Sequence, residues 1–351
     1  MTFGAPDRPA SGDYFAYDST QQRWEREGLP PGVDLNEYFG MDFDPFQWRV
    51  PANLAVLPRY ERVVVEETEE YQTVRTGGEV VKKLKNVPPP AMPVWISYPL
   101  QSRADWEDYR SRLNPDTPER LPPDLPELVA KCPDRDYPLG MWLGGTYGYM
   151  RNWWGMEQIS VLLYDDPALI EEMVECLTHL SLGLLNRVLE SGMQLDWVMF
   201  WEDLAYKNGP LISPSLFKRY CVPYYRAVMD RVHAAGIPVA MVDSDGDIRE
   251  IVPFWLDAGV NIMHPMEVAA GMDVVSLRKQ YGKRIGFFGG IDKRVLAGTR
   301  SDIRNVVLPQ LRACFEEGGF IPACDHAVPP DVSFDNYRYY RELVMEASGK
   351  V

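Results

Sequence analysis

Short apolar segments alternate with amphipathic helical patterns along most of this chain, and this alternation limits the possible folds more than any other feature. Strands are expected at 140–143, 197–201, 238–242, 260–264, 284–288 and 319–322. Helices are expected around them, at 153–164, 167–190, 213–235, 248–257, 273–281, 301–317 and 334–347. A strand followed by a helix every 25–40 residues or so (about the length of one βα unit) predicts a parallel sheet covered by helices.

Polar residues follow nearly every expected strand, which favours a closed barrel over an open sheet. An open sheet binds ligands at one switch point, whereas a barrel collects reactive groups from the C-terminal ends of many strands. The sequence contains no G-x-G-x-x-G and no G-x-x-x-x-G-K-[ST] motif, so neither NAD nor a nucleotide is expected as a cofactor. We therefore predict a TIM (β/α)₈ barrel, although only about seven strands can be placed from the pattern.

Residues 1–92 differ from the rest of the chain in being rich in Pro, Asp, Glu and aromatic residues. Runs of β-branched residues at 62–65, 71–75 and 79–81, with a Gly pair at 77–78, predict a β-hairpin. We expect an N-terminal extension over 1–92, with this hairpin packed on the barrel, and the barrel itself over 93–351.

Composition narrows the classes of function and location. The formal net charge of −15 argues against nucleic-acid binding, which needs clustered Lys and Arg. Five scattered cysteines without a C-x-x-C pair predict free thiols in a reducing compartment. No signal-peptide pattern and no apolar run of about 18 residues is visible. We expect a cytoplasmic protein without a membrane segment.

An apolar strand runs directly into three carboxylates at Asp243, Asp245 and Asp247. Extended backbone would put Asp243 and Asp245 on one face, where like charges raise a pKa or recruit a cation. Asp247 has a simpler explanation, because Glu250 three residues later completes a helix capping box. Asp243 and Asp245 are therefore the candidates for function.

Two of the four histidines, His264 and His326, fall just beyond expected strands, and Asp325 adjoins His326. A histidine at a barrel strand end is a candidate general acid or base, although a structural role is the common alternative.

Glu202 and Asp203 follow the apolar strand at 197–201, and Glu267 follows the strand at 260–264. Each is either an acid/base group or a carboxylate that accepts from backbone N–H groups at a helix start. The pair Gly289-Gly290 before Asp292 either lets the backbone approach a ligand or forms a simple turn. Tyr147 and Trp153-Trp154 either line a pocket for a planar ligand or pack in the core.

Several motifs, taken in order, resemble the uroporphyrinogen decarboxylase superfamily, which also contains methylcobamide-linked methyltransferases and O-demethylase methyltransferases. The segments that carry the resemblance are Asp7-Arg8-Pro9, Tyr147-Gly148-Tyr149-Met150-Arg151, Gly155-Met156-Glu157, Gly289-Gly290-Ile291-Asp292, and Gly318-Gly319-Phe320-Ile321-Pro322-Ala323-Cys324-Asp325-His326 with Pro329-Pro330. The resemblance covers roughly residues 95–347 and implies a TIM barrel with a deep cleft at its C-terminal face.

The resemblance also implies roles for particular residues. His326 matches a cleft histidine of the family, and Glu202 and Asp203 lie where relatives carry an acidic pair, which makes these three the catalytic candidates. Substrate contacts are assigned to Tyr147, Arg151, Gly290 and Asp292. The run Asp243-Ser244-Asp245 stands where cobamide methyltransferases carry a His-x-Cys zinc motif. Carboxylates in that place put thiolate zinc chemistry in doubt. A zinc ion held by Asp243, Asp245, His264, Glu267 and Cys324 is the tentative ligand set.

The function that follows from the resemblance is methyl transfer from a small methoxy or methylamino compound to a corrinoid, with the corrinoid supplied by a partner protein. Cofactor-free decarboxylation of a porphyrinogen or a related carboxylate is the alternative. It is disfavoured because the N-terminal region lacks the arginine-bearing signature of those enzymes and the chain is acidic. A non-catalytic tetrapyrrole-binding module is a third reading. The oligomeric state stays open, with a homodimer among the alternatives.

Overall fold

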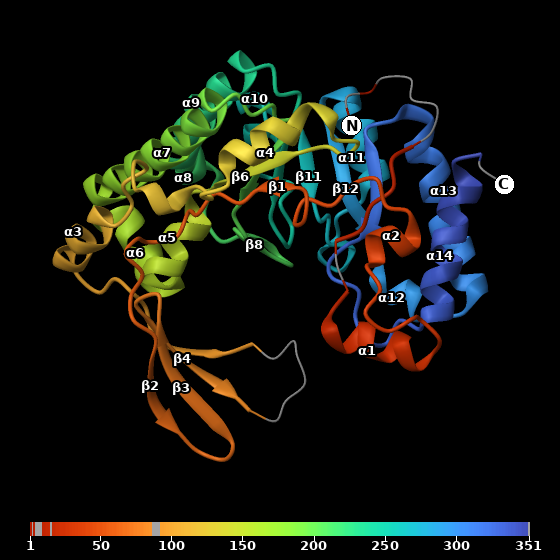
Figure 1. The fold of residues 1–351 in the computed structure, drawn as a ribbon, viewed down its shortest axis with the longest axis horizontal. Coiled ribbons are helices and arrows are strands. Elements are labelled where there is room, and N and C mark those ends of the chain that lie inside the picture. The colour runs from red at the N-terminus through yellow and green to blue at the C-terminus, as the bar shows by residue number, and fades with distance from the viewer. Residues whose placement is uncertain (2, 4–8, 15, 86–91, 350–351) are drawn as a thin grey trace.

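A parallel sheet wrapped by helices forms the larger part of the molecule, and a separate antiparallel sheet projects from it (Figure 1). The computed structural model describes residues 1, 3, 9–14, 16–85 and 92–349. Asp7 and Arg8 of the family-like start motif lie outside the described residues.

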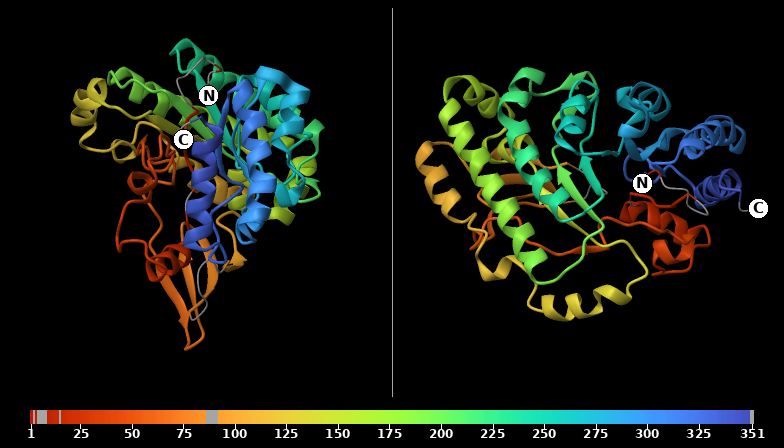
Figure 2. Two further views of the ribbon diagram at one scale, coloured as in Figure 1. Left: turned by 90° about the vertical axis from the view of Figure 1, so that its right-hand side faces the viewer. Right: turned by 90° about the horizontal axis from the view of Figure 1, so that it is seen from above.

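Seven strands form the parallel sheet, and every neighbouring pair in it is parallel. In spatial order they are β1 (Arg49–Val50), β6 (Gly140–Gly144), β7 (Trp197–Trp201), β10 (Val239–Asp243), β11 (Ile262–His264), β12 (Gly286–Ile291) and β13 (Phe320–Cys324). Each of the six predicted strands is present, with ends shifted by a few residues. The helices lie on the outer side of the sheet (Figure 2), so the predicted TIM barrel with an N-terminal elaboration is confirmed.

The N-terminal segment lies against the last strand of the barrel instead of standing apart. Gly12 bridges Phe43 in parallel, and the backbone N–H of Cys324 donates to the Asp13 carboxylate at 2.9 Å. A Cβ at Gly12 would meet the carbonyl oxygen of Phe43 at 2.9 Å and Ile321 at 3.1 Å. Only glycine allows this close approach, by which residues of the extension occupy the space beside β13.

Alternate residues of each strand face the barrel interior. Trp197 and Met199 of β7, Met241 of β10 and Ile321 of β13 form one interior cluster, into which Phe43 inserts from the N-terminal segment. The intervening residues pack outward against the helices. This alternation decides which polar residues at the strand ends can reach the cleft.

The helices that cover the barrel follow the strands along the chain. They are α3 (Arg103–Ser111), α4 (Leu125–Lys131), α5 (Tyr147–Trp154), α6 (Met156–Asp165), α7 (Pro167–Glu190), α8 (Pro214–Leu216), α9 (Val222–Ala234), α10 (Val252–Ala258), α11 (Val274–Tyr281), α12 (Lys293–Leu296), α13 (Arg300–Glu317) and α14 (Phe334–Ala347). The N-terminal segment contains two further helices, α1 (Asp18–Arg26) and α2 (Leu35–Phe39). The remaining helical elements are a π-helical turn, η3 (Phe217–Cys221), and the 3₁₀ turns η1 (Pro118–Arg120), η2 (Cys132–Asp134), η4 (Val268–Ala270) and η5 (Gly282–Arg284). A small pair of strands consists of β8 (Ala205–Tyr206) and β9 (Gly209–Pro210). Across the described residues, no helix combines the length and the apolar character needed to cross a membrane.

Two helix predictions differ from the structure in an informative way. The helix predicted over 153–164 is two helices, α5 and α6, because Gly155 adopts φ +79° where a side chain would collide with the ring of Tyr98. The helix predicted over 248–257 begins only at Val252. The intervening residues form turns, and Ile248 and Ile251 are buried in the core.

The antiparallel sheet contains the three β-branched runs of the predicted hairpin region as strands, and one further strand. Its strands are, in spatial order, β2 (Val63–Glu67), β3 (Tyr71–Thr76), β4 (Glu79–Leu84) and β5 (Val94–Ser97). Residues on both sides of position 92 therefore belong to this sheet, while β1 from the N-terminal extension pairs with β6 of the barrel.

Arg120 ties the extension to the first barrel helices. Its side chain is completely buried and donates to four backbone carbonyl groups, those of Asn53, Ala55, Arg112 and Asn114. A buried guanidinium is costly unless its N–H groups are bonded, so this network holds the segment that leads into the antiparallel sheet.

Replacing Arg120 by Lys should lower the free energy of unfolding by about 2–4 kcal/mol, because an ammonium cannot reach four carbonyls in a plane and leaves several of them unpaired. Urea denaturation followed by circular dichroism would measure the change. Arg219→Lys on the surface, where Arg219 pairs with Glu171 and lies over the ring of Tyr220, is the matched control and should change stability by less than about 0.5 kcal/mol. Equal losses in the two variants would contradict this account.

Candidate active site

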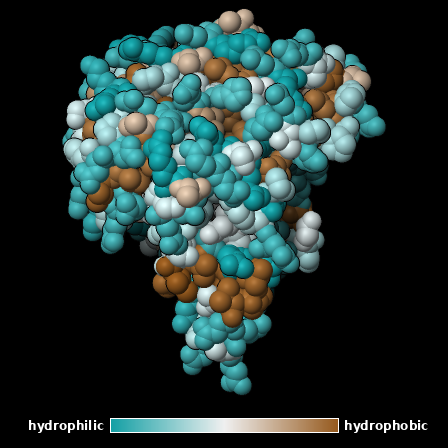
Figure 3. Space-filling view, turned by 90° about the vertical axis from the view of Figure 1, so that its left-hand side faces the viewer, coloured by the Kyte–Doolittle hydropathy of each residue, from teal (hydrophilic) through white to brown (hydrophobic). Residues whose placement is uncertain are grey.

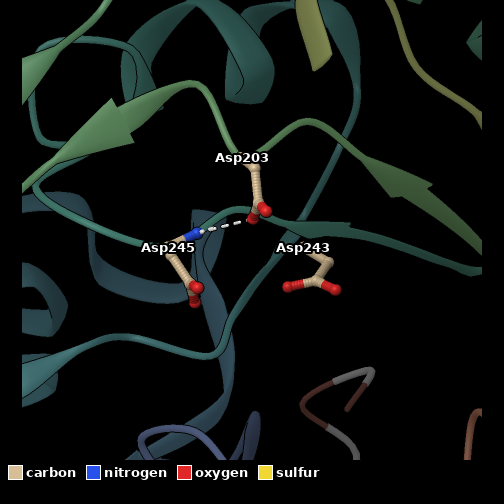
Figure 4. Close-up of side chains that lie close together, drawn as sticks. All are labelled: Asp203, Asp243 and Asp245. Carbon is tan, nitrogen blue, oxygen red and sulfur yellow. Dashed lines mark hydrogen bonds between the residues drawn. The ribbon is translucent and has the colours of Figure 1, made fainter. Parts of the chain in front are cut away.

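Three carboxylates gather at the C-terminal ends of β7 and β10. One oxygen from each of Asp203, Asp243 and Asp245 lies within 4.8 Å of the others (Figure 4). Asp243 faces the interior because Met241, two residues earlier on β10, does so. Asp203 turns toward it with φ +46°, an uncommon backbone conformation for a residue with a side chain. The Asp203 carboxylate accepts the backbone N–H of Asp245 at 3.4 Å.

Burial and mutual repulsion favour the protonated forms of two of these carboxyl groups, those of Asp203 and Asp243. Burial, followed by the charges of Asp203 and Asp245, raises the pKa of Asp243 well above its ordinary value. Burial and the charge of Asp245 raise the pKa of Asp203 from 3.8 to about 6. Asp203 therefore exchanges a proton near neutral pH, which suits a general acid or base.

His326 approaches the cluster from β13. Its Nε2 lies 3.5 Å from Asp245 Oδ2, and its Nδ1 lies 3.4 Å from the hydroxyl of Tyr17. Burial disfavours the charged imidazolium, but the hydrogen bond and the charge of Asp245 outweigh it, so the pKa of His326 is raised. The pair Asp245–His326 thus places a second proton donor beside the carboxylates.

His264 is buried as a neutral imidazole. Its Nδ1 lies 2.8 Å from the carbonyl oxygen of Phe288, and its ring stacks between Phe288 and Tyr14. Burial lowers the pKa of His264 to about 4. The Nε2 atom of His264 has no hydrogen-bond partner within the described parts of the chain. If Nδ1 carries the proton, Nε2 offers a lone pair. Asp243 is the register partner of His264 on β10, so the two side chains share the interior face.

Tyr14 covers this arrangement from the N-terminal segment. Its ring is stacked on His264 with centroids 4.8 Å apart and tilted on His326 at 5.3 Å. Burial and then the charges of the three aspartates raise its pKa, so the phenol stays protonated. Sequence reasoning missed Tyr14 and Tyr17 because neither follows a strand. Their only sequence signal is the aromatic content of the extension.

Arg151 supplies a positive charge next to the cluster. Its guanidinium donates to the backbone carbonyl of Asp203 and lies 4.0 Å from the Asp203 carboxylate. It also lies 5.7 Å above the ring of Trp201. Arg151 is the one predicted substrate contact that the structure brings to the carboxylates.

Glu202 is buried behind the cleft. Its carboxylate accepts from the backbone and hydroxyl of Thr146, from the backbone of Gly148 and from the hydroxyl of Tyr225. Burial raises the pKa of Glu202 although these bonds oppose it. A Cβ at Gly148 would lie 2.2 Å from the Glu202 carbonyl oxygen, so glycine is needed there. Glu202 therefore fixes the start of α5, which carries Arg151.

Glu267 lies at the edge of the site. It accepts the backbone N–H of Gly246 at 3.2 Å and lies 3.9 Å from the Lys293 ammonium. Lys293 is closer to the buried Asp325, at 3.3 Å. Asp325 also accepts the backbone N–H groups of Val268 and Lys293. Asp325 thus joins the loops after three strands and positions His326 next to it.

Besides Glu202, four of the predicted site residues are not brought to the carboxylates. Tyr147 is fully buried in the helical layer, with its hydroxyl 3.5 Å from the Leu211 carbonyl oxygen. A Cβ at Gly290 would meet Val274 at 2.6 Å, so this glycine serves packing. Asp292 caps α12 and pairs with Arg294. Cys324 faces outward, since its neighbour Ala323 faces the interior.

The donor set fits a cation held by oxygen and imidazole, and it does not fit a thiolate zinc site. Three clustered carboxylates offer hard oxygen ligands, and the buried Nε2 of His264 faces the same interior. Cys324 lies on the other side of the sheet, and burial raises the pKa of its thiol well above the ordinary value. Of the tentative ligands, Asp243 and Asp245 are in the cluster, together with Asp203.

Comparisons with known proteins agree on a family and a fold. The model of the family described as Uroporphyrinogen decarboxylase (URO-D) matches residues 83–347. A protein of Chlorobaculum tepidum named uroporphyrinogen decarboxylase is 22% identical over 270 residues, which cover 73% of this chain and 72% of the relative. A protein of the same name from Coxiella burnetii is 22% identical over 202 residues, 54% of this chain and 50% of the relative.

Among solved structures, a methyltransferase from Methanosarcina mazei superposes with a TM-score of 0.63 at 15% sequence identity. The match covers 98% of this chain and 96% of that chain. At this level of identity the likeness shows a shared fold, and it agrees with the barrel described above.

Asp203→Asn should change how stability depends on pH. The pKa of Asp203 is raised from 3.8 to about 6 in the folded chain, so its stabilising contribution is full below pH 3.8 and is lost as the pH rises through 6. Asparagine does not ionise, so the Asp203→Asn variant does not lose this stabilisation as the pH rises. Relative to wild type, the variant should therefore gain about 1–2 kcal/mol of unfolding free energy between pH 4.5 and 7.5.

Urea denaturation at the two pH values would measure this gain, with the exposed Asp116→Asn as the control. A pH dependence that is the same for wild type and for Asp203→Asn would contradict the raised pKa.

Proposed function

The chain belongs to the uroporphyrinogen decarboxylase family, and we propose that within it the protein is a methyltransferase that demethylates a small methoxy or methylamino compound. The observation that carries the proposal is the cluster of protonatable groups at the barrel mouth. Asp203 exchanges a proton near neutral pH, and His326 is held on Asp245 beside it. Breaking a bond from methyl to oxygen or nitrogen leaves negative charge on that heteroatom, which an adjacent acid neutralises.

In this proposal the residues of the site have separate tasks. Protonated Asp203 or the His326 imidazolium donates a proton to the departing heteroatom, and Asp245 favours the charged form of His326. Arg151 orients Asp203 through its backbone carbonyl, while Tyr14 covers the histidines and limits access of water. A corrinoid brought by a partner protein would supply the nucleophile that accepts the methyl group.

A divalent cation is an alternative to the proton. Asp203, Asp243 and Asp245 would hold it through oxygen, with the lone pair of His264 facing the same interior. Bound there, it would polarise the heteroatom of the substrate as a Lewis acid. Metal analysis of the purified protein and of Asp243→Asn would separate the two versions.

A cavity next to Trp201 supports a small substrate with an apolar portion. It has a volume of about 360 Å³ and is lined mainly by apolar and aromatic side chains. The aromatic rings in its wall are those of Tyr109, Tyr149, Trp153 and Trp201. Trp201 links this cavity to the site, because Arg151 lies 5.7 Å from its ring and 4.0 Å from the Asp203 carboxylate; the three aspartates are not among the residues that line the cavity.

Decarboxylation of a porphyrinogen remains the second candidate because the curated relatives carry that name. A buried carboxylate such as Asp243 would stabilise a positively charged pyrrole in that reaction. A substrate with many carboxylates also requires cations around it. Near the aspartates the described side chains supply Arg151, Lys293 and the His326 imidazolium, of which Lys293 is already paired with Asp325 and His326 with Asp245. Because so few cations are available for a substrate with many carboxylates, the charges of the site favour methyl transfer over decarboxylation of a porphyrinogen.

His326→Ala should lower kcat/KM for corrinoid methylation by about 10²–10⁴-fold, the range expected for loss of a general acid. Asp292→Asn is the matched control and should stay within about threefold, since Asp292 caps α12 and keeps an acceptor oxygen in the variant. The change in the corrinoid absorption spectrum on methylation measures both rates.

The same preparation should be given uroporphyrinogen and assayed for released CO₂. CO₂ release without corrinoid methylation, abolished in Asp243→Asn, would replace methyl transfer by decarboxylation. An identical loss of activity in His326→Ala and Asp292→Asn would contradict the assignment of the acid.

A further inference from the structure

A cavity of about 920 Å³ opens beside β1 and β6, and its described lining includes none of the residues of the candidate active site. The lining contains three arginines, Arg49, Arg59 and Arg187, and a single acidic residue, Glu119. The chain as a whole has a net charge of −15, so the sign of the charge around this cavity is opposite to that of the molecule. A concave surface with an excess of positive charge concentrates anions.

Arg49 is held at the cavity by an aromatic ring. Its guanidinium lies 4.9 Å from the centre of the Trp142 ring. The indole N–H of Trp142 donates to the carbonyl oxygen of Pro45 at 3.0 Å, which fixes the ring. Contact with a ring uses the flat face of a guanidinium and leaves its N–H edges available for an oxyanion. Neither Arg49 nor the exposed Arg59 pairs with a carboxylate within the described residues.

Arg187 adds a guanidinium whose orientation is fixed by the backbone. It donates to the carbonyl oxygens of Pro115 and Thr117. Among the residues that the structure describes, no carboxylate pairs with it. Burial, followed by the charge of Arg187, lowers the pKa of Arg120, so a further positive charge lies close to this part of the wall. An anion in the cavity would therefore be attracted by several guanidinium groups.

Much of the remaining wall is apolar and stiff. It is formed by four prolines and two leucines, which are Pro51, Pro118, Pro122, Pro123, Leu121 and Leu125. Because proline fixes its φ angle, this wall keeps its shape before a ligand arrives. A preformed wall lowers the cost of ordering on binding. The cavity thus suits a ligand that has an anionic group on an apolar body.

Strand register separates this cavity from the candidate active site. Arg49 is the register partner of Gly140, and Gly140 is the register partner of Trp197, the first residue of β7. Asp203 comes after Trp201, the last residue of that strand. Four residue steps of about 3.3 Å put these two levels of the barrel roughly 13 Å apart. The cavity is therefore a second site, on the side of the barrel where the strands begin.

We propose that this cavity binds an organic anion, a carboxylate or a phosphate ester on an apolar body, through Arg49, Arg59 and Arg187. The planar guanidinium fork bonds two oxygens of a carboxylate or of a phosphate at once. The volume lies within the roughly 300–1,000 Å³ of small-molecule pockets. Barrel enzymes react at the C-terminal ends of their strands, so a ligand bound here is held without being transformed. The proposal does not depend on the reaction at the aspartates.

Isothermal titration of the full chain with three probes tests the proposal. The probes are 2-naphthoate, 2-naphthyl phosphate and the neutral 2-naphthamide. At least one of the two anions should bind at least about tenfold more tightly than the amide, because a hydrogen bond to a charged group contributes this much. Its affinity should fall as the NaCl concentration rises. The anion that binds more tightly identifies the oxyanion, carboxylate or phosphate, that the site prefers.

Arg49→Gln combined with Arg59→Gln should raise the Kd of that anion at least about tenfold. Arg219→Gln combined with Arg284→Gln is the matched control, because it removes the same charge from two surface ion pairs, and it should change the Kd by less than about threefold. Arg59→Gln alone changes only an exposed side chain and should still weaken binding, which guards against a folding defect in the double variant.

Asp203→Asn should leave the Kd of the anion unchanged, since Asp203 does not line the cavity. A Kd that changes in Asp203→Asn and not in the arginine double variant would place the anion at the aspartates and overturn the proposal. Equal affinity for the three probes, no binding of either anion by the wild-type chain, or equal losses in the two double variants would overturn it as well.

Discussion

Mutual repulsion among three closely spaced carboxylates, one buried and two half-buried, is the constraint around which the cleft of this barrel is organised. Asp203, Asp243 and Asp245 cannot all stay ionised at such short separations without a proton or a cation between them. Two nearby contacts offset this excess of negative charge: Arg151 approaches Asp203, and His326 pairs with Asp245. The chemistry proposed for the site uses the proton or the cation that this repulsion recruits.

The N-terminal segment completes the cleft that the barrel strands begin. Gly12 and Asp13 attach it to β13, and this attachment carries Tyr14 over His264 and His326. A barrel without this segment would leave the two imidazoles open to water, where a buried hydrogen-bond network loses much of its strength. The extension is therefore part of the site, while the antiparallel sheet projects away from the barrel (Figure 1) and exposes apolar side chains (Figure 3).

Residues that appear chemical in sequence have two different uses here. Glu202 and Asp325 are both buried carboxylates at strand ends, and both accept several backbone N–H groups that hold neighbouring loops. The residue next to each, Asp203 or His326, reaches the cleft instead. Both pairs lie just after the last residue of a strand, where the chain leaves the sheet, so one member of each pair holds the loops and the other is available for chemistry.

The sequence by itself determined the alternation of strands and helices, the barrel, the hairpin and the polar residues at the strand ends, because hydrophobic period and turn residues are local properties. It could not decide which of Glu202 and Asp203 faces the cleft, or that Cys324 points outward, because one step of register reverses every side chain. It could not find Tyr14 either, whose place depends on packing between segments three hundred residues apart or so in the chain. Those choices belong to the tertiary structure, since only long-range contacts bring these side chains together.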